Sequence, residues 1–460
     1  MVVTDSDGLR VAVIGAGPSG FYVAEQLFKE VTASVSVDIY DRLPTPWGLV
    51  RSGVAPDHPA IKSVSRVFEK TAADPRFRFY GNVEFGVDLT RADLALHYDA
   101  VVYAVGAQAD RRLGIPGEDL PGSYAAVDFV AWYNGHPDHP DRQFDLSGKR
   151  AVLIGNGNVS IDVARILSSD LATLGGTDIA DHALTALRDS AIRQVVVCGR
   201  RGPEQAAFTT PELRELGGLP GVRVVAHQQD VGSPTDENPN SSLEILRRHA
   251  AEPGEARPRE IEFRFLLSPV EVRGAGRVEE VVFDVNELVY DGEAARVKPT
   301  GKREVVPCDL LIRSIGYRGV PLPGVPFDES TGRIPNDAGR VLRSGRPAAG
   351  EYCTGWVKRG PSGVIGTNRK CATETVGALL ADYVEGVFAR PANLPREAVD
   401  ELFDGRGITV VDQAGWLRID SHERSLGAQA SRPRVKLCRY EGLLAQAGVV
   451  PDVNHAKRIR

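Results

Sequence analysis

Two glycine-rich loops of the same kind are the residues of this chain best suited to chemistry. Each follows a strand-like apolar run, at 9–14 or at 151–154, and each opens a helix-like stretch. A single loop of this type can be only a tight strand-to-helix turn, but two in this context predict two cradles for dinucleotide pyrophosphates, with electron transfer between them. The small residues of the two loops are Gly15, Gly17 and Gly20 in GAGPSG, and Gly155, Gly157 and Ser160 in GNGNVS.

The two units differ in the charges at the ends of their second strands. Asp41 ends a strand expected at 35–42, where a carboxylate can accept hydrogen bonds from ribose hydroxyls, which favours a nucleotide without a 2′-phosphate. Arg200 and Arg201 follow the corresponding strand of the second unit, where two guanidiniums can bind a phosphate that a carboxylate would repel. The second site is therefore predicted to prefer NADP over NAD. The alternative for both strand ends is a solvated charge.

Further elements must hold these loops in place. We expect a helix over 18–30, and a buried strand at 100–105 after which the chain crosses to another domain. An extra helix is expected at 178–190, within the second unit, and a β-meander over 261–289. The strand in CDLLIRSIGYRG, ending near Gly316, is expected to return the chain to the first domain.

A tryptophan and a helix start near residue 360 indicate a further cofactor contact. A helix predicted from about Thr367 follows several turn glycines, and its free N–H groups suit the anionic edge of a cofactor. Trp356, in the loop before it, can cover a flavin or nicotinamide ring, although a tryptophan in such a loop can also serve only packing.

Composition excludes several classes of protein. The 460 residues can bury two or more cores, and 42% hydrophobic with 25% charged residues is typical of a globular protein. A net charge of −6 argues against bulk nucleic-acid binding. No apolar run is long enough for a membrane-spanning helix, and no targeting segment is evident at residues 1–7, so we expect a cytoplasmic protein. The five cysteines lack the spacing of a redox dithiol or a metal site, and no metal is expected.

Taken together, these segments resemble the adrenodoxin reductase family of NADPH-dependent ferredoxin reductases. The resemblance implies an α/β fold with two Rossmann-like dinucleotide-binding domains, of the glutathione-reductase-like, adrenodoxin reductase type. It implies an FAD-binding domain made of residues 1–106 and 318–460, tail included, and an NADP-binding domain at 107–317. The segments that carry it are VAVIGAGPSGFY, PTPWGLVRSGVAPDHPAIK, VVYAVGAQADRRLGIPGE, VLIGNGNVSIDVARIL, VCGRRGPEQAAFTTPELREL and TGWVKRGPSGVIGTN.

Site residues carry over from the family by motif position. Asp41 stands where some members have glutamate, and Ser160 stands in place of the third glycine of the second loop. The implied FAD contacts are Gly15, Gly17, Ser19, Gly20, Asp41, Leu49, Val83, Trp356, Gly363, Val364 and Ile365. The implied NADP contacts are Asn156, Gly157, Asn158, Val159, Arg200, Arg201, Glu212 and Gly363.

Two residues are the candidates for the catalytic site. His58 resembles a histidine near the family's flavin, and Glu212 is expected on the cofactor side of the other domain. Hydride transfer between stacked rings needs alignment more than an acid–base pair, so both are expected to tune cofactor geometry and potential. A histidine in a proline-rich loop can equally be an ordinary surface residue.

The resemblance implies a flavoprotein oxidoreductase that passes electrons from NADPH through FAD to a ferredoxin-type iron–sulfur protein. A small acidic partner is expected to dock near Arg247 and Arg248, which resemble a basic docking helix, although paired arginines on a helix are often only solvated. A disulfide reductase would need a dithiol beside the flavin. A flavin subunit of a larger synthase and a non-catalytic NADP sensor remain open alternatives.

Overall fold

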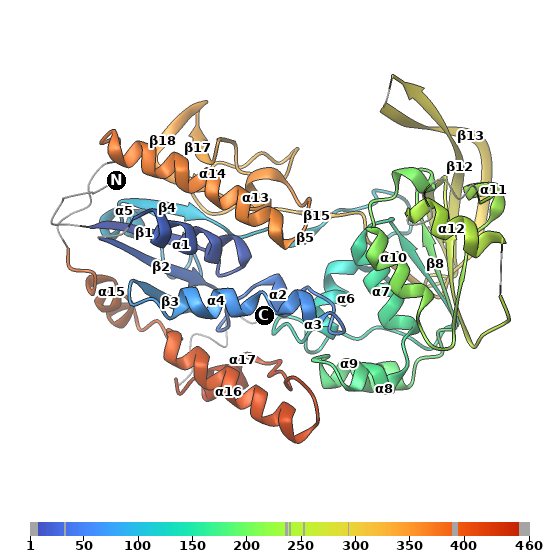
Figure 1. Ribbon diagram of the computed structural model, residues 1–460, viewed down its shortest axis with the longest axis horizontal. Helices are drawn as coiled ribbons and strands as arrows, with labels where there is room; N and C mark the ends of the chain where they lie inside the picture. Colours follow the sequence, from blue (N-terminus) through green and yellow to red (C-terminus); the bar gives the residue numbers. More distant parts are fainter. Residues whose placement is uncertain are drawn as a thin grey trace.

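The computed structural model describes residues 8–31, 34–234, 238, 241–251, 254–292, 294–388 and 394–449. In this part of the chain, two largely parallel β-sheets form the centres of two halves. Figure 1 shows the halves side by side along the long axis of the molecule.

The first sheet has seven strands in the order β16-β17-β18-β4-β1-β2-β3 within the described residues. Strands β18, β4, β1, β2 and β3 run parallel, and β16 and β17 are added antiparallel at one edge. The strands span Leu9–Ile14 (β1), Val35–Asp41 (β2), Phe77–Gly81 (β3), Ala100–Tyr103 (β4), Asn336–Asp337 (β16), Arg340–Arg343 (β17) and Arg346–Cys353 (β18).

Strand β1 is apolar apart from Arg10 because both faces of the sheet are covered. Val11 and Val13 pack into the core beneath α1 and α14, whereas Ala12 and Ile14 pack into a second core on the opposite face. The helices of this half are α1 (Pro18–Glu30), α2 (Leu49–Ser52), α3 (Pro59–Lys62), α4 (Ser65–Ala72), α5 (Arg91–His97), α13 (Trp356–Arg359), α14 (Ile365–Val384), α15 (Ala398–Arg406), α16 (Gln413–Gln429) and α17 (Tyr440–Gln446).

The second sheet has six parallel strands in the order β6-β14-β7-β8-β10-β9 in the described chain. Its central strand β7 alternates as β1 does, with Leu153 in one core and Val152 in another. The strands span Ser123–Ala125 (β6), Arg150–Ile154 (β7), Gln194–Cys198 (β8), Val222–Val225 (β9), Arg259–Arg264 (β10) and Leu310–Arg313 (β14).

Helices of the second half include the extra helix predicted at 178–190, which the structure has as α9. They span Ala126–Tyr133 (α6), Asn158–Ser168 (α7), Leu171–Gly175 (α8), Asp181–Arg188 (α9), Thr210–Gly217 (α10), Gln228–Val231 (α11) and Ser242–Ala251 (α12), with a 3-10 turn at Pro203–Gln205 (η1).

The β-meander lies later in the chain than predicted. The segment at 261–264, expected as its first strand, belongs instead to β10 of the parallel sheet, because its alternate apolar residues Ile261 and Phe263 are buried in the core of that sheet. The meander is the antiparallel sheet β11 (Leu267–Arg273), β12 (Glu280–Asp291) and β13 (Ala294–Pro307). Its β12–β13 hairpin extends away from the second half in Figure 1.

Two short strands lie where the chain passes between the halves. Strand β5 (Ala109–Asp110) pairs antiparallel with β15 (Tyr317–Arg318). The first follows the sheet strand β4, and the second follows β14 of the other sheet. The outgoing and returning segments therefore run side by side, near the positions at which the sequence predicts the two crossings.

Candidate active site

The first glycine loop has a different steric reason for each of its glycines. Gly15 has a φ of +112°, and a Cβ there would lie 2.6 Å from the carbonyl oxygen of Ala104. A Cβ on Gly20 would collide with the carbonyl oxygen of Gly15, so this glycine lets α1 pack closely on the strand. Open space borders Gly17, directly before α1. The loop therefore leaves room beside a helix N-terminus, as a pyrophosphate requires.

Asp41 holds the first loop in place through the backbone. Its Oδ2 accepts a hydrogen bond from the Ala16 N–H at 2.8 Å, and its Oδ1 accepts one from the Leu43 N–H at 2.9 Å. Burial raises the pKa of this carboxyl above its ordinary value, and the two backbone hydrogen bonds oppose the rise. Each oxygen keeps a further acceptor position, so a ribose hydroxyl can still be bound.

The other predicted flavin contacts converge on the same loop. The Val83 N–H donates to the carbonyl of Asp41 at 2.9 Å. Gly48, directly before Leu49, packs so closely that a Cβ on it would lie 3.0 Å from the Cα of Gly17.

Ser19 and Trp356 meet at the turn before α13. The side chain of Ser19 occupies the space where Gly355 would carry a Cβ, and Trp356 follows that glycine. The Trp356 ring lies 5.4 Å from the ring of Tyr317, centroid to centroid. Its Nε1 is buried without a hydrogen-bond partner among the described residues, and an unpaired buried donor of this kind fits a polar ligand.

The loop before α14 remains open to solvent. Gly363 has a φ of +77°, and Val364 is 62% exposed. Helix α14 begins at Ile365, two positions before the predicted Thr367, because the Thr367 hydroxyl accepts the Val364 N–H at 3.2 Å and closes the first turn. The exposed helix start leaves N–H groups available to an anionic group.

The second glycine loop repeats the first with one substitution. Gly155 has a φ of +125° and packs against the carbonyl of Ser314, and open space again borders Gly157. Ser160 replaces the third glycine and is fully buried, so the helix there tolerates a small side chain. At the start of α7, the Asn158 side chain accepts the Thr209 N–H at 2.8 Å, and Val159 packs on the neighbouring core.

The strand register corrects the position that corresponds to Asp41. Tyr40 pairs with Ile14, and Cys198 pairs with Ile154, so the residue equivalent to Asp41 is Gly199. Arg200 and Arg201 follow it and are exposed. Neither guanidinium forms an ion pair with another described residue, so both are available to an anionic ligand.

A cluster of charged residues joins the two halves between the start of α3 and the helices α7 and α10. Arg165 binds Asp57 at 2.5 Å (Nε to Oδ2), and His58 Nε2 lies 2.8 Å from Glu215 Oε2 and 3.6 Å from Glu212 Oε2. His58 and Glu212, which the sequence names as catalytic candidates, are thus brought together across the halves. Figure 1 shows α3 beside α6 and α7 at this junction.

Burial dominates the electrostatics of this cluster. It raises the pKa of Glu212, and the negative charge of Asp162 adds to the rise, whereas His58 and Arg165 oppose it. Burial also raises the pKa of Asp162 above its ordinary value. The side-chain atoms of His58, Glu212 and Glu215 that could bind a metal ion lie within 4.8 Å of one another. The Arg165 guanidinium, however, already pairs with both glutamates.

Three comparisons relate this chain to known proteins. Residues 9–196 match the family described as pyridine nucleotide-disulphide oxidoreductase. An NADPH-ferredoxin reductase FprA of Mycobacterium tuberculosis is 51% identical over 94% of this chain and 98% of its own. The chain belongs to the NADPH-ferredoxin reductase family. A mitochondrial NADPH:adrenodoxin oxidoreductase of Arabidopsis thaliana is 42% identical over 95% of each chain.

The fold of this NADPH-ferredoxin reductase family member is confirmed by a solved relative. A structure of Mycobacterium tuberculosis FprA in complex with NADPH matches with a TM-score of 0.90 at 50% identity, over 96% of this chain and 99% of that one. The predicted α/β fold with two dinucleotide-binding units is therefore correct.

The cysteines of this chain are mostly buried. All five are free, and four of them are buried. Burial raises the pKa of Cys308 and of Cys353 to about 12, so these thiols stay protonated and unreactive at neutral pH.

The predicted docking helix is α12, on which the two arginines differ. Arg248 is exposed, whereas Arg247 turns back and donates to the carbonyl of Val231 at 2.8 Å. Of the pair, Arg248 therefore presents the more accessible charge to a partner.

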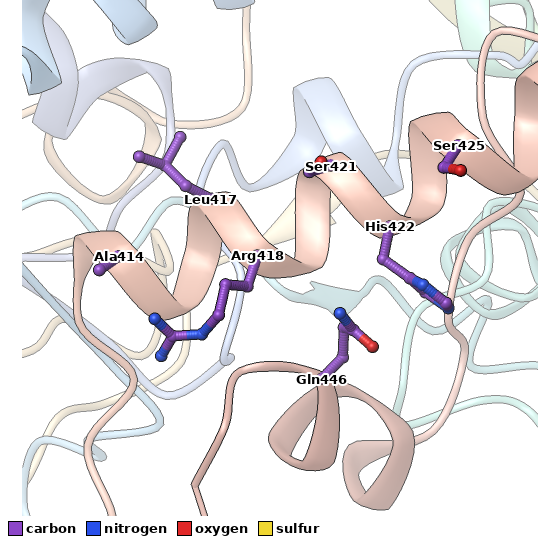
Figure 2. Close-up of a pocket in the computed structure, with 7 residues that line it drawn as sticks. All are labelled: Ala414, Leu417, Arg418, Ser421, His422, Ser425 and Gln446. Atoms are coloured by element: carbon purple, nitrogen blue, oxygen red, sulfur yellow. The ribbon is translucent and has the colours of Figure 1, made fainter.

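A hollow of about 550 Å³ lies between α16 and α17, away from both glycine loops. Figure 2 shows Arg418 and His422 of α16 on the side that faces Gln446 from the end of α17. Among the described residues, no helix combines the length and the low polarity needed to cross a bilayer.

Sequence reasoning missed Asp57, Asp162, Arg165 and Glu215 in the charged cluster. Asp57 and Arg165 are 108 positions apart, and nothing in their spacing links them. Helical spacing could have found part of the cluster. Asp162 and Arg165 share one face of α7, and Glu212 and Glu215 share one face of α10.

Proposed function

We propose that this enzyme is an NADPH:ferredoxin oxidoreductase in which each half binds one of its two cofactors. Residues 1–106 and 318–460 form the FAD-binding half with its tail, and 107–317 form the NADP-binding half. Sheet membership supports this division, because β16 to β18 return to the sheet of β1 to β4, while β6 to β10 and β14 make the other sheet.

The observation that carries the proposal is the contrast between the two strand ends beside two open glycine loops. Asp41 is a half-buried carboxylate that accepts the Ala16 N–H of the first loop. Arg200 and Arg201 are exposed, form no ion pair with another described residue and follow Gly199, which packs against Asn156 of the second loop. The first arrangement suits FAD, which carries no 2′-phosphate, and the second suits NADP. A flavin bound there would supply the conversion of a two-electron hydride from NADPH into single electrons for an iron–sulfur protein.

Protein residues supply binding and alignment in this proposal. Ser19, Leu49, Val83, Trp356 and Gly363 to Ile365 line the flavin side, and Asn156 to Val159 line the other loop. Asp57 and Arg165 pair across the two halves at 2.5 Å, and with Arg42–Asp138 and Lys62–Asp178 they fix how the two halves face each other. His58 and Glu212 act where the halves meet, tuning cofactor geometry rather than exchanging protons.

A ferredoxin-type iron–sulfur protein is the proposed partner, docking on α12 through Arg248. Acidic partners approach a basic surface faster at low salt. Charge reversal by Arg248→Glu should raise the apparent KM for ferredoxin at low salt, so the ratio of ferredoxin to dye activity should fall. An unchanged ratio would exclude α12 as the docking helix. The four buried free thiols fit the reducing cytoplasm, which we propose as the location.

The function is tested by cytochrome-coupled activity of the purified protein with NADPH or NADH, with and without candidate ferredoxins. The proposal expects activity that needs both NADPH and a ferredoxin. A protein that binds NADPH without bleaching its flavin band would instead be a sensor.

A further inference from the structure

Three consecutive carbonyl groups fix the backbone that carries Arg200 and Arg201. The Gly199 carbonyl accepts from the Leu267 N–H at 3.0 Å, and the Arg201 carbonyl accepts from the Leu266 N–H at 3.1 Å. The Arg200 carbonyl, between them, accepts from the side chain of Asn286 at 3.1 Å. This middle hydrogen bond is the one of the three that a side-chain substitution removes.

The position of Asn286 is fixed by burial and by hydrogen bonds of both its side chain and its backbone. It lies in β12 at an irregularity of the β12–β13 pairing and is only 3% exposed. Its Nδ2 also donates to Ser268 Oγ at 2.9 Å, and its own N–H donates to the Leu266 carbonyl at 2.7 Å. Leu266 has a φ of +57°, rare for a leucine, and Asn286 thereby holds the same residue that binds the Arg201 carbonyl.

The orientation of the Asn286 amide follows from its neighbour. A backbone carbonyl only accepts, so the NH₂ group must face Arg200. The Oδ1 atom is then buried without a partner among the described residues, an arrangement that costs free energy. Because an apolar residue would fill this buried position without that cost, the amide of Asn286 serves its hydrogen bonds rather than packing alone.

We propose that Asn286 is a positioning residue for nucleotide specificity, acting through the backbone of Arg200. Neither guanidinium is tied to another described side chain, so the tethered backbone sets where the two cations point. Asn286 thus favours ligands that carry a 2′-phosphate, and it does not contribute to binding of the rest of the nucleotide. This inference rests on the proposed role of Arg200 and Arg201.

The test compares two small probes that differ in the 2′-phosphate, 2′,5′-ADP and 5′-AMP, by calorimetry on the FAD-loaded protein. In Asn286→Ala the affinity for 2′,5′-ADP should fall about fivefold, the value of one ordinary hydrogen bond, while that for 5′-AMP changes by less than about twofold. Flavin reduction at saturating NADPH should keep its rate, with the loss confined to KM. The isosteric Asn286→Asp, which lacks the donor, should act in the same direction if the alanine variant does not fold.

Ser268→Ala is the matched control, because it removes the other acceptor of the same amide and leaves the Arg200 contact in place. It should leave the affinity ratio of the two probes unchanged. Equal loss for both probes in the Asn286 variants, or no loss, would overturn the inference.

A double variant, Arg200→Ala with Arg201→Ala, separates the two proposals. If it fails to reduce the ratio of the affinity for 2′,5′-ADP to that for 5′-AMP, the assignment of the 2′-phosphate site to these arginines is wrong. If it reduces the ratio while the Asn286 variants do not, only the role of Asn286 is wrong.

Discussion

The two dinucleotide-binding units share a backbone and differ in the residues at the ends of their second strands. The Gly15 N–H donates to the Tyr40 carbonyl at 2.7 Å, and the Gly155 N–H donates to the Cys198 carbonyl at 2.8 Å, so the two loops are closed in the same way. Open space borders the second glycine of each. The scaffold that receives a pyrophosphate is therefore common to both.

The residue at the end of the second strand is an acid, Asp41, in the first unit and a glycine, Gly199, in the second. Asp41 reaches back to the loop with both carboxylate oxygens. At Gly199 the Asn156 side chain fills the place of a Cβ, so a side chain at 199 would require Asn156 to move. The second unit thus disfavours an acid at this position by packing as well as by charge.

The next residue is arginine in both units, but only one of the two is available. Arg42 pairs with Asp138 at 2.6 Å, across to the other half, whereas Arg200 has no ion-pair partner among the described residues. The comparison teaches that the two units differ in whether the arginine after the second strand is paired, which is the difference that the proposed nucleotide specificity requires.

Removing Arg200 and Arg201 together should have the largest effect on the difference between the two units. In Arg200→Ala with Arg201→Ala, the preference for NADP⁺ over NAD⁺ should fall about a hundredfold or more, because each charged hydrogen bond contributes about 1.5–3 kcal/mol. Dissociation constants for the two nucleotides measure the change. Arg42→Ala is the control, and a preference that survives the double change would refute the assignment.

Placing an aspartate at position 199, as the first unit has at position 41, should destabilise the fold by steric conflict. Gly199→Asp forces its Cβ onto the Asn156 side chain and should lower the free energy of unfolding by about 1–3 kcal/mol. Adding Asn156→Ala should recover most of this loss, which denaturant unfolding measures. No recovery would mean that the conflict lies elsewhere.

Removing one acceptor from the first unit should weaken flavin binding. Asp41→Asn can accept only one of the two backbone N–H groups, which leaves the other unpaired at a cost of about 1–3 kcal/mol. We expect about tenfold weaker FAD binding, measured by flavin release on dilution. Asp41→Glu keeps both acceptors and should retain FAD. Equal release from both variants would contradict this interpretation.

Acid should destabilise the folded chain through His136, which binds the backbone of Asp138, the partner of Arg42. Burial lowers the pKa of His136 to about 3 from 6.5, and its Nδ1 accepts the Asp138 N–H at 3.1 Å. Between these two values the unfolded chain binds more protons, so stability present above pH 6.5 is lost as the pH falls toward 3.

His136→Asn keeps an acceptor and removes the titration. Over that pH range it should reduce the loss of stability by an amount on the order of 1 kcal/mol. The comparison is made by urea unfolding of both proteins at several pH values. An identical pH dependence of the two would exclude His136 as the acid-sensitive group.

Local features of this chain were predictable from sequence because their causes are local. The glycine loops, the bounds of α1 and the extra helix α9 follow from apolar runs, glycines and helix spacing, and the structure confirms them. His58 and Glu212 were named from motif resemblance, and the structure places them 3.6 Å apart, while their roles stay predictions.

Features that depend on pairing between distant segments were not predictable. The equivalence of Asp41 with Gly199 needs the strand register, and sequence order alone suggested Arg200. Segment 261–264 alternates like a meander strand but joins the parallel sheet, because its place is decided by β8. The Asn286 contact spans 86 positions and requires the irregular β12 to bring it to Arg200.

Anaerobic mixing of the yellow protein with NADPH and, separately, with NADH tests the central claim most directly. If one half holds FAD and the other selects a 2′-phosphate through Arg200 and Arg201, the flavin band bleaches rapidly at low NADPH, and NADH needs a far higher concentration. A polypeptide that is colourless and cannot be reconstituted with FAD, or one that bleaches equally with both nucleotides, would contradict the account.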